Sequence, residues 1–202
     1  TDLGKKIPLD YFHHSDVVHL AKDLIGKKIY TNFNDSLTSG IITETEAYNG
    51  RTDKACHAYG GLKTKRTETI YRQGGIAYVY LCYGIHHLLN FVTNKEDLAD
   101  AILIRAIEPI DGIESMMERR KKSKLDKTLT SGPGTLSQAL GITTKNNGLV
   151  LNSNDLWIEE APSPVKEKDI TTTTRIGVDY AGKDALLPWR FYLNTSKFVS
   201  KR

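Results

Sequence analysis

The sequence contains little cysteine and no long apolar run. Two cysteines, Cys56 and Cys82, stand among 202 residues, which is too few for the disulfide framework of a small secreted protein. They are not spaced as a zinc site. No apolar run approaches the roughly 18 residues of a membrane span, and the start, residues 1–6, lacks the apolar core of a secretion signal. These absences favour an intracellular, reducing environment without membrane contact.

The remaining composition is that of an ordinary folded protein. Hydrophobic residues make up 39% and charged residues 26% of the chain, close to globular averages. The length suits one domain of ordinary size. The sequence shows no internal repeat and no linker rich in proline, glycine or serine. We therefore expect a single domain over residues 1–202, and a monomer.

The charge balance is weakly basic, with 28 Lys and Arg residues against 24 Asp and Glu, a net charge of +4. Most single basic runs are simply solvated. Here two basic groups flank an aromatic-rich segment, which favours a polyanionic ligand. The two groups are Arg119, Arg120, Lys121, Lys122, Lys124 and Lys127, and Arg51, Lys54, Lys63, Lys65, Arg66 and Arg72.

The hydrophobic pattern predicts a mixture of helices and strands. Helices are expected over 15–24, with Ser15 as the cap, over 111–122 and over 131–140. Strands are expected over 27–31, 41–48, 77–83, 88–92, 101–107, 157–158, 174–178 and 190–199. The segments 34–40, 49–75, 146–154 and 162–168 are expected to be turns and loops. This order predicts an α+β fold, a single compact domain with a curved, mainly antiparallel sheet and surrounding helices.

Glu46 is the first candidate for chemistry, because it stands near a strand end, directly before Ala47-Tyr48-Asn49-Gly50. Most strand-end carboxylates are merely solvated, and we assign the neighbouring Glu44 to that class. A carboxylate is ionised at neutral pH, so Glu46 is also suited to act as a general base or to stabilise positive charge.

The segment Tyr78-Val79-Tyr80-Leu81-Cys82-Tyr83-Gly84 is unusually aromatic. An aromatic strand face is the ordinary interpretation. Tyr80 and Tyr83 are three residues apart, so a regular strand would send them to opposite faces, and Gly84 indicates a bend or an end. Aromatic rings that leave a strand end can stack on nucleic-acid bases.

His57 lies in the polar loop, where a lone histidine is most often solvated. The adjacent pairs His13-His14 and His86-His87 have no third ligand at a suitable spacing, so we predict no metal site. The chain lacks a phosphate-binding loop, a dinucleotide-binding glycine motif and a Gly-x-Ser-x-Gly nucleophile motif.

Several motifs occur together in one order along the chain. They are Thr45-Glu46-Ala47-Tyr48, His57, the segment 78–84, Asn90, Arg105-Ala106-Ile107-Glu108-Pro109, Ser131-Gly132-Pro133-Gly134-Thr135-Leu136 and Arg175-Ile176-Gly177-Val178. In this combination the chain resembles the alkyladenine (3-methyladenine) DNA glycosylase family, from about residue 9 to residue 199. Each motif alone is weak, whereas the combination is specific.

The resemblance implies a function and a site. Members release alkylated or deaminated purines from duplex DNA after flipping the nucleotide out, leave an abasic site without cutting the strand, and use neither metal nor organic cofactor. Glu46 matches the carboxylate that activates water, and Arg105 and the backbone carbonyl of Ile176 match groups that hold this water. The resemblance thus implies damaged double-stranded DNA as partner and water as co-substrate.

The resemblance also assigns the base pocket. Tyr48 and His57 match one wall, Tyr80 the opposite wall, Tyr83 the wedge that fills the gap left by the flipped nucleotide, and Asn90 the residue that limits purine choice. Three positions depart from the common family pattern. Leu62 stands where many members have a basic residue, and Thr67 and Ile70 stand where Asn and Met are common, positions that concern loop packing and duplex contact.

Two other functions remain open from the residues alone. A non-catalytic module that binds damaged nucleic acid would share the aromatic pocket but would not need Glu46. A metal-dependent nuclease would need a cluster of carboxylates, for which Glu44 and Glu46 alone are poor. The single bare domain favours a bacterial cytoplasmic protein; in a eukaryote the same enzyme would act in the nucleus.

Overall fold

Strand β2 (Ser36–Tyr48) is the longest element and the centre of the fold in the computed structural model, which describes residues 4–202. It forms a hairpin with β1 (Lys28–Phe33) through Asn34 and Asp35, both with positive φ. Asn and Asp tolerate this left-handed conformation, so two residues close the hairpin. The predicted turn over 34–40 is therefore too long, because residues 36–40 pair with β1 as strand.

All strand pairs in the described part of the chain are antiparallel. The main path of the sheet is β3-β4-β5-β2-β1-β6. The further strands on this path are β3 (Ala77–Cys82), β4 (His86–Thr93), β5 (Asp100–Pro109) and β6 (Leu156–Glu159). A separate pair, β7 (Ile170–Thr173) and β8 (Arg190–Leu193), joins the sheet through β2. The predicted α+β fold with a mainly antiparallel sheet is confirmed.

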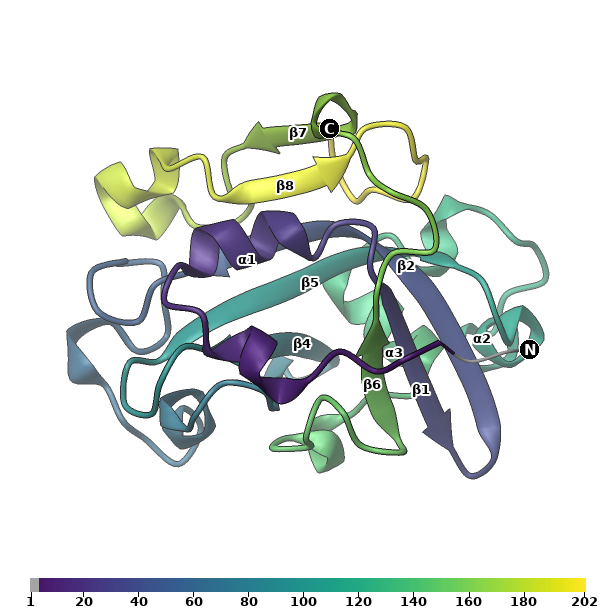
Figure 1. Cartoon of the computed structure of the whole chain (residues 1–202), viewed down its shortest axis with the longest axis horizontal. Coiled ribbons are helices and arrows are strands. Elements are labelled where there is room, and N and C mark those ends of the chain that lie inside the picture. The colour runs from purple at the N-terminus through teal and green to yellow at the C-terminus, as the bar shows by residue number, and fades with distance from the viewer. Residues whose placement is uncertain (1–3) are drawn as a thin grey trace.

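β2 has different partners along its two halves, and this bends the sheet. Its first half pairs with β1, whereas Glu44–Glu46 pair with β8, and β5 runs along the other edge. A β-bulge interrupts the β2–β5 register around Glu44, and bulges bend and twist a strand. Figure 1 shows the result, with β1 and β6 running steeply and β7 and β8 lying nearly horizontally.

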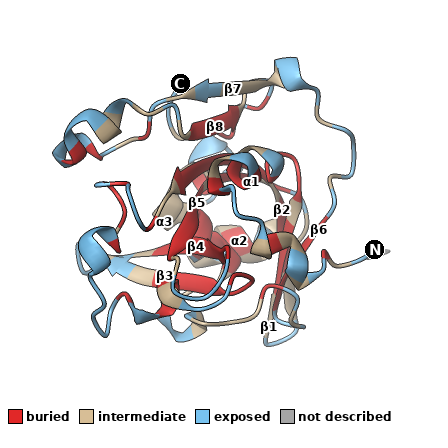
Figure 2. Ribbon diagram, turned by 60° about the vertical axis from the view of Figure 1, so that its left-hand side comes forward, coloured by how far each residue is buried: buried red, intermediate tan, exposed pale blue. Residues whose placement is uncertain are grey.

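Helices cover both faces of the sheet (Figure 1). α1 (Val17–Asp23) lies in front of the sheet in this view, and α2 (Ile113–Arg120) and α3 (Pro133–Leu140) lie behind it. Asp16, rather than the predicted Ser15, caps α1 by accepting hydrogen bonds from two backbone amides of the first turn. Apolar side chains of β4 and β5, with those of the helices, form the buried core in the middle of the molecule (Figure 2).

Two predicted strands are wrong, one in its existence and one in its extent. The strand expected over 174–178 is absent; β7 lies just before it, and the chain turns at Gly177, whose φ is +74°. The strand expected over 190–199 ends at Leu193, after which Asn194 and Thr195 form a turn. In both places β-branched and aromatic residues raised the strand signal, whereas buried polar contacts direct the backbone away from the sheet.

The long segment 49–75 and the C-terminal segment around 179–186 project from the same end of the molecule, at the left in Figure 1. Short 3-10 helices and turns make up both. The short helices of the chain are η1 (Leu9–His13), η2 (Tyr59–Gly61), η3 (Glu68–Tyr71), η4 (Lys127–Leu129), η5 (Thr144–Asn146), η6 (Glu167–Asp169) and η7 (Asp179–Leu186). The expectation of a loop over 49–75 is confirmed, because that range contains only turns, bends and short 3-10 helices.

Two residues of the predicted basic patch have structural roles. Arg119 donates a hydrogen bond to the Ala139 carbonyl at 2.8 Å, and Arg120 donates one to the Leu129 carbonyl at 3.1 Å. Both therefore tie α2 to its neighbours. Within residues 4–202 no helix is long and apolar enough to cross a membrane. Residues 1–3, half of the N-terminal hexapeptide that lacks the apolar core of a secretion signal, lie outside the described residues.

Candidate active site

Glu46 lies near the end of β2 and is fully buried. The Tyr48 hydroxyl donates a hydrogen bond to its Oε1 at 2.8 Å, and the Ile176 backbone amide donates one to its Oε2 at 2.7 Å. The Arg105 guanidinium lies 3.5 Å from Oε1. A carboxylate offers about four lone-pair positions, so these contacts fix its orientation and leave room for one more donor. Ile176 thus contacts Glu46 through its backbone amide. That its carbonyl holds the water stays a prediction.

Tyr48 is held in its protonated form by its surroundings. Burial, and then the charge of Glu46 and the hydrogen bond to it, raise the pKa of the Tyr48 phenol well above its ordinary value. Its ring also packs 4.9 Å from the guanidinium carbon of Arg175. Tyr48 is thus a fixed hydrogen-bond donor to Glu46 and a rigid aromatic wall at the same time.

Glu44 is buried and ion-paired, which corrects its assignment as a solvated carboxylate. Its Oε2 accepts a hydrogen bond from Arg190 at 2.8 Å, and its Oε1 accepts one from the Ser200 amide at 2.7 Å. Glu44 and Glu46 are two residues apart on one strand and share a face, as strand alternation predicts, and Arg105 lies between the two carboxylates. Alternation does not reveal that Glu44 is buried and paired, because its other partners come from near the end of the chain.

A cavity of about 370 Å³ opens beside this carboxylate pair. Seven of the eight site residues predicted from the sequence line it, namely Tyr48, His57, Tyr80, Tyr83, Asn90, Arg105 and Ile176. Glu46, the eighth, is buried directly behind two of them, Tyr48 and Arg105. Residues from β2, the 49–75 segment, β3, β4, β5 and the turn after β7 therefore converge on one pocket.

The aromatic walls differ from the predicted arrangement. The rings of His57 and Tyr80 contact each other, with centroids 4.6 Å apart and planes inclined by 67°. They therefore share one wall instead of facing each other across the pocket. Tyr48, held by Glu46 and Arg175, forms a separate wall. The family resemblance placed His57 with Tyr48, whereas the 49–75 segment brings His57 against Tyr78 and Tyr80 of β3.

His57 is neutral at physiological pH. Burial and, next, the positive charge of Arg66 lower the pKa of its imidazole below the ordinary value of 6.5. Its Nδ1 lies 3.2 Å from the Tyr78 hydroxyl, so the imidazole is fixed on its inner side as well. A neutral ring in contact with Tyr80 presents an uncharged surface to the cavity.

Asn90 lies on β4 opposite Tyr78 and is almost fully buried. Its side-chain amide donates a hydrogen bond to the Tyr78 carbonyl at 3.3 Å. This local bond is the ordinary role of such an asparagine. It also fixes the direction of the amide at the pocket wall, where Asn90 lines the cavity.

Tyr83 lies at the tip of the β3–β4 hairpin and is 92% exposed. It and Gly84 both have positive φ, +51° and +70°, and the Ile85 amide donates a hydrogen bond to the Cys82 carbonyl at 3.2 Å. Positive φ is costly for a residue with a side chain. The tight turn thus holds a large aromatic ring in solvent.

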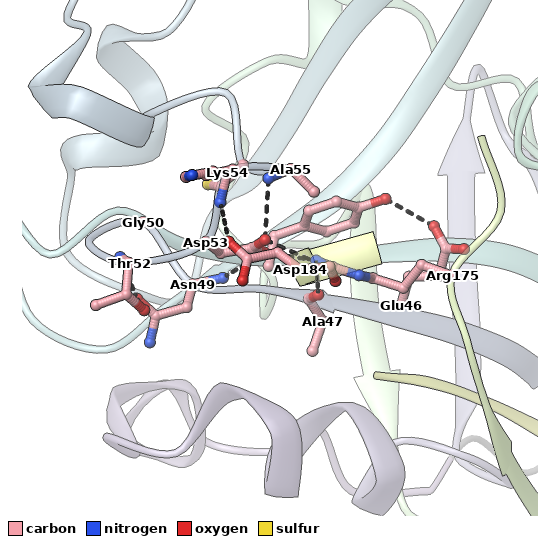
Figure 3. Close-up of polar contacts among 12 residues, drawn as sticks. Glu46, Ala47, Asn49, Gly50, Thr52, Asp53, Lys54, Ala55, Arg175 and Asp184 are labelled. Atoms are coloured by element: carbon pink, nitrogen blue, oxygen red, sulfur yellow. Dashed lines mark hydrogen bonds and ion pairs between the residues drawn. The ribbon is translucent and has the colours of Figure 1, made fainter. Parts of the chain in front are cut away.

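A buried ion pair that the sequence reasoning missed supports this site (Figure 3). Arg175 and Asp53 have fully buried side chains and share two hydrogen bonds. Arg175 also donates to the carbonyls of Ala47, at 3.0 Å, and Asp184, at 2.9 Å. Burial alone would lower the pKa of Arg175, but the hydrogen bond and charge of Asp53 raise it above its ordinary value. One guanidinium thus joins the end of β2 to both projecting segments.

The only sequence signal for this pair was the position of Arg175 directly before Ile176 in a quoted motif. Asp53 gave none, since an acidic residue in a polar loop is most often solvated.

The three departures from the family pattern divide between the surface and the interior. Leu62 is exposed, whereas Thr67 and Ile70 are buried, and the Thr67 hydroxyl donates to the Leu62 carbonyl at 3.1 Å. Thr67 and Ile70 therefore support the loop that carries His57.

Within the part of the chain that the structure describes, no group of three or more His, Cys, Asp or Glu residues is arranged to hold a metal ion. The polar groups of the pocket are instead a buried carboxylate, the guanidinium beside it and a fixed amide. With two aromatic walls and an exposed aromatic tip next to it, this arrangement suits a flat ring, and a buried carboxylate lies behind the pocket lining.

Comparison with known proteins gives the family. The family described as methylpurine-DNA glycosylase (MPG) matches residues 11–197. A relative from Chlamydia pneumoniae is 49% identical over 188 residues, covering 91% of this chain and 93% of that protein. Relatives from Clostridium perfringens and Bacillus cereus are 42% and 43% identical over 199 residues, each covering 95% of this chain and 97% of the relative. All three are named "Putative 3-methyladenine DNA glycosylase".

The chain belongs to the methylpurine-DNA glycosylase family. It is an enzyme, a hydrolase of DNA repair that acts on DNA.

Proposed function

We propose that the protein is a monofunctional DNA glycosylase of base excision repair. It flips alkylated or deaminated purines out of duplex DNA and releases them by hydrolysis, leaving an abasic site. Its substrates are 3-methyladenine, 7-methylguanine, hypoxanthine and ethenoadenine. The observation that carries this proposal is the oriented, fully buried Glu46 directly behind an aromatic pocket that is large enough for one purine.

Recognition begins with extrusion of the nucleotide. The reacting carbon, C1′, is inaccessible inside stacked duplex, and flipping costs a few kcal/mol. Tyr83 offsets part of this cost by filling the space that the nucleotide leaves, as inserted aromatic wedges do. Its exposure at a rigid hairpin tip, next to the pocket mouth, supports this role. Exposed Lys and Arg residues contact phosphates without reading the sequence.

Inside the pocket the flipped purine stacks between Tyr48 on one side and the His57–Tyr80 wall on the other. Asn90 limits the choice of purine, because its fixed amide occupies the space that the 2-amino group of guanine would need. Adenine and hypoxanthine lack this group, whereas 7-methylguanine carries it and is released despite the poorer fit, because its positive charge makes it a good leaving group. Such exclusion by a clash discriminates without tightening the binding of the correct base.

Glu46 then activates the water. The Tyr48 hydroxyl and the Ile176 amide occupy one position on each carboxylate oxygen and leave a lone pair for the water proton. As the C1′–nitrogen bond breaks, its electron pair goes to the purine, the water oxygen bonds to C1′, and the water proton goes to Glu46. The carboxylate also stabilises positive charge on the sugar. Arg105 limits the movement of Glu46 and lies close enough to help hold the water.

The test is direct. The protein is incubated with duplex DNA that carries one hypoxanthine or 7-methylguanine, and the DNA is then heated in alkali, which cuts the strand at abasic sites. Cutting at the lesion that requires both protein and alkali is expected. Cutting without alkali would point to a nuclease or a lyase, and no cutting together with lesion binding would favour the binding module. Loss of cutting on addition of a metal chelator would contradict the metal-free mechanism.

We further propose that the whole chain acts as one glycosylase domain and as a monomer, because the pocket is built from residues of one chain. The relatives are bacterial, which supports a location with the bacterial chromosome in the cytoplasm. A sedimentation or light-scattering measurement at catalytic concentrations tests the monomer.

A further inference from the structure

Arg66 occupies an unusual position at the pocket rim. It lines the active-site cavity and also a second cavity of about 300 Å³ on the outer side of Tyr80 and Leu81. Its guanidinium carbon lies 5.2 Å from the centroid of the Tyr80 ring, and its Nη2 donates a 3.4 Å hydrogen bond to the Leu81 carbonyl. The guanidinium is therefore held beside the wall on which a flipped base would stack.

The charge of Arg66 is not neutralised by a neighbour. None of the ion pairs found within residues 4–202 includes it. Arg175, the cation that packs on Tyr48, is by contrast paired with Asp53 and fully buried. The positive charge of Arg66 also reaches the pocket, because it contributes to the lowered pKa of His57 on the same wall. The two aromatic walls thus differ, since one has a neutralised cation beside it and the other a free one.

A free positive charge acts oppositely on the two classes of lesion in the proposed function, on which this inference rests. When a neutral purine such as hypoxanthine leaves, the electron pair of the C1′–nitrogen bond stays on the base, which is negative until it takes up a proton. When a cationic base such as 7-methylguanine leaves, the same electron pair neutralises it. A nearby cation stabilises the first transition state and opposes entry of the second base.

We infer that Arg66 is a specificity residue that favours the release of neutral purine lesions over cationic ones. It acts through its charge at the Tyr80 wall and needs no direct bond to the reacting atoms. The same charge gives the enzyme part of the leaving-group assistance that neutral lesions require, in a pocket whose other described cations are paired with carboxylates.

The experiment compares Arg66→Gln with wild type on two duplexes that differ only in the lesion, hypoxanthine or 7-methylguanine. Single-turnover release is measured with enzyme in excess. We expect the ratio of hypoxanthine release to 7-methylguanine release to fall about tenfold, the size of effect that one partly solvated charge several ångströms away can have. Arg66→Lys, which keeps the charge, should restore most of the ratio. Arg66 is exposed, so the fold should tolerate both changes.

Lys65→Gln is the matched control. Lys65 is an exposed neighbouring cation that lines only the outer cavity. Its loss should weaken duplex binding for both lesions alike and leave their release ratio unchanged. An equal decrease of both rates in Arg66→Gln would overturn the inference and make Arg66 a phosphate contact. If wild-type protein releases neither lesion, the proposed function itself fails and the inference fails with it.

Discussion

The buried end of β2 and the tip of the β3–β4 hairpin border the same pocket but are built in opposite ways. At the end of β2, Glu46 is fully buried and fixed by Tyr48 and Ile176. At the hairpin tip, Tyr83 is almost fully exposed and makes the turn in a costly backbone conformation. In the first region the polar side chains make internal hydrogen bonds, whereas in the second a large aromatic ring is left exposed to solvent.

Under the proposed function, each region performs a different part of the task. A carboxylate that acts on a bond must be held in one orientation, and hydrogen bonds from fixed donors do this best in a dry site. A side chain that enters a duplex must be free until the DNA arrives. Changes at the first region should therefore affect the rate of base release, and changes at the second should affect duplex binding.

Glu46→Gln should give the largest effect. The amide is nearly isosteric, so the fold and lesion binding should remain, but Gln cannot take a proton from water. We expect single-turnover base release to fall by about 10²–10⁴-fold, the usual size of a lost general base. Release within a few-fold of wild type would show that Glu46 is not the base.

Glu44→Gln is the matched control for that experiment, because the two carboxylates are two residues apart on one strand. Glu44 is bound by Arg190 and Ser200, so its neutralisation should destabilise the C-terminal segment. We expect a lower fraction of active enzyme, seen as reaction amplitude, with a nearly unchanged rate constant for the molecules that remain folded. A rate loss equal to that of Glu46→Gln would assign both carboxylates to the chemistry.

Asp53→Asn should have the next largest effect, and mainly on stability. It leaves the Arg175 guanidinium buried without its counter-charge, and breaking a buried ion pair costs about 3–5 kcal/mol in free energy of unfolding. Urea unfolding measures this. Since Arg175 contacts Ala47 and packs on Tyr48, the release rate should also fall while duplex affinity stays close to wild type. Unchanged stability would mean that the pair is not desolvated.

The residues around Glu46 show how far the sequence alone can lead. The residues themselves pointed to Glu46 and Tyr80, which lie on strands that the hydrophobic pattern predicts. Tyr48, Asn90 and Arg105 came from the resemblance to a known family. Arg175, Asp53 and the true environment of Glu44 were not readable. Their partners lie 122 to 156 residues away along the chain, and no local pattern encodes a contact over that distance.

The same limit explains the errors in the fold. The strand predicted over 174–178 has a suitable β-branched composition, but Arg175 and Ile176 turn inward to Asp53 and Glu46. The wall assigned to His57 came from the family resemblance, and the observed ring contact with Tyr80 differs from it, because a segment of turns can bring a residue to either side of a pocket. Strands and hairpins follow from local rules, whereas the polar network of a site follows from tertiary contacts.

Tyr83→Ser tests the exposed region and should have an intermediate effect. Duplex binding and flipping should weaken by about 1–3 kcal/mol, the value of one aromatic–base stacking contact. Release from single-stranded DNA should change little, because no gap in a stack has to be filled there. Binding to matched duplex and single-stranded lesions measures the difference. An equal loss on both substrates would remove the wedge assignment.

Asn90→Ala should have a smaller effect, confined to base selection. Removing the amide opens space at the pocket wall, so guanine mismatched with thymine should be released about tenfold faster, the usual effect of one small group in a pocket. Hypoxanthine release should stay roughly intact. Single-turnover release from duplexes that differ only in the target base is the measurement. A uniform decrease, with no guanine release, would mean that Asn90 only fixes the Tyr78 carbonyl.

The pH dependence of stability should show the smallest effect and concerns the wall between the two regions. The pKa of His57 is lowered in the folded protein by burial and by Arg66, so the unfolded chain binds this proton more readily. The free energy of unfolding therefore falls as the pH drops below about 6.5, and it keeps falling down to the folded-state pKa.

His57→Gln should remove this contribution, so the variant should lose less stability than wild type between about pH 8 and pH 5. Arg66→Gln should also reduce the loss of stability toward low pH, but by less than His57→Gln, because it removes only one of the two causes that lower the pKa of His57. Urea unfolding at a series of pH values measures all three proteins, and the other histidines cancel in the comparison. Parallel curves for wild type and His57→Gln would show that His57 takes up its proton equally well in both states, and they would place the imidazole in solvent instead of against Tyr80.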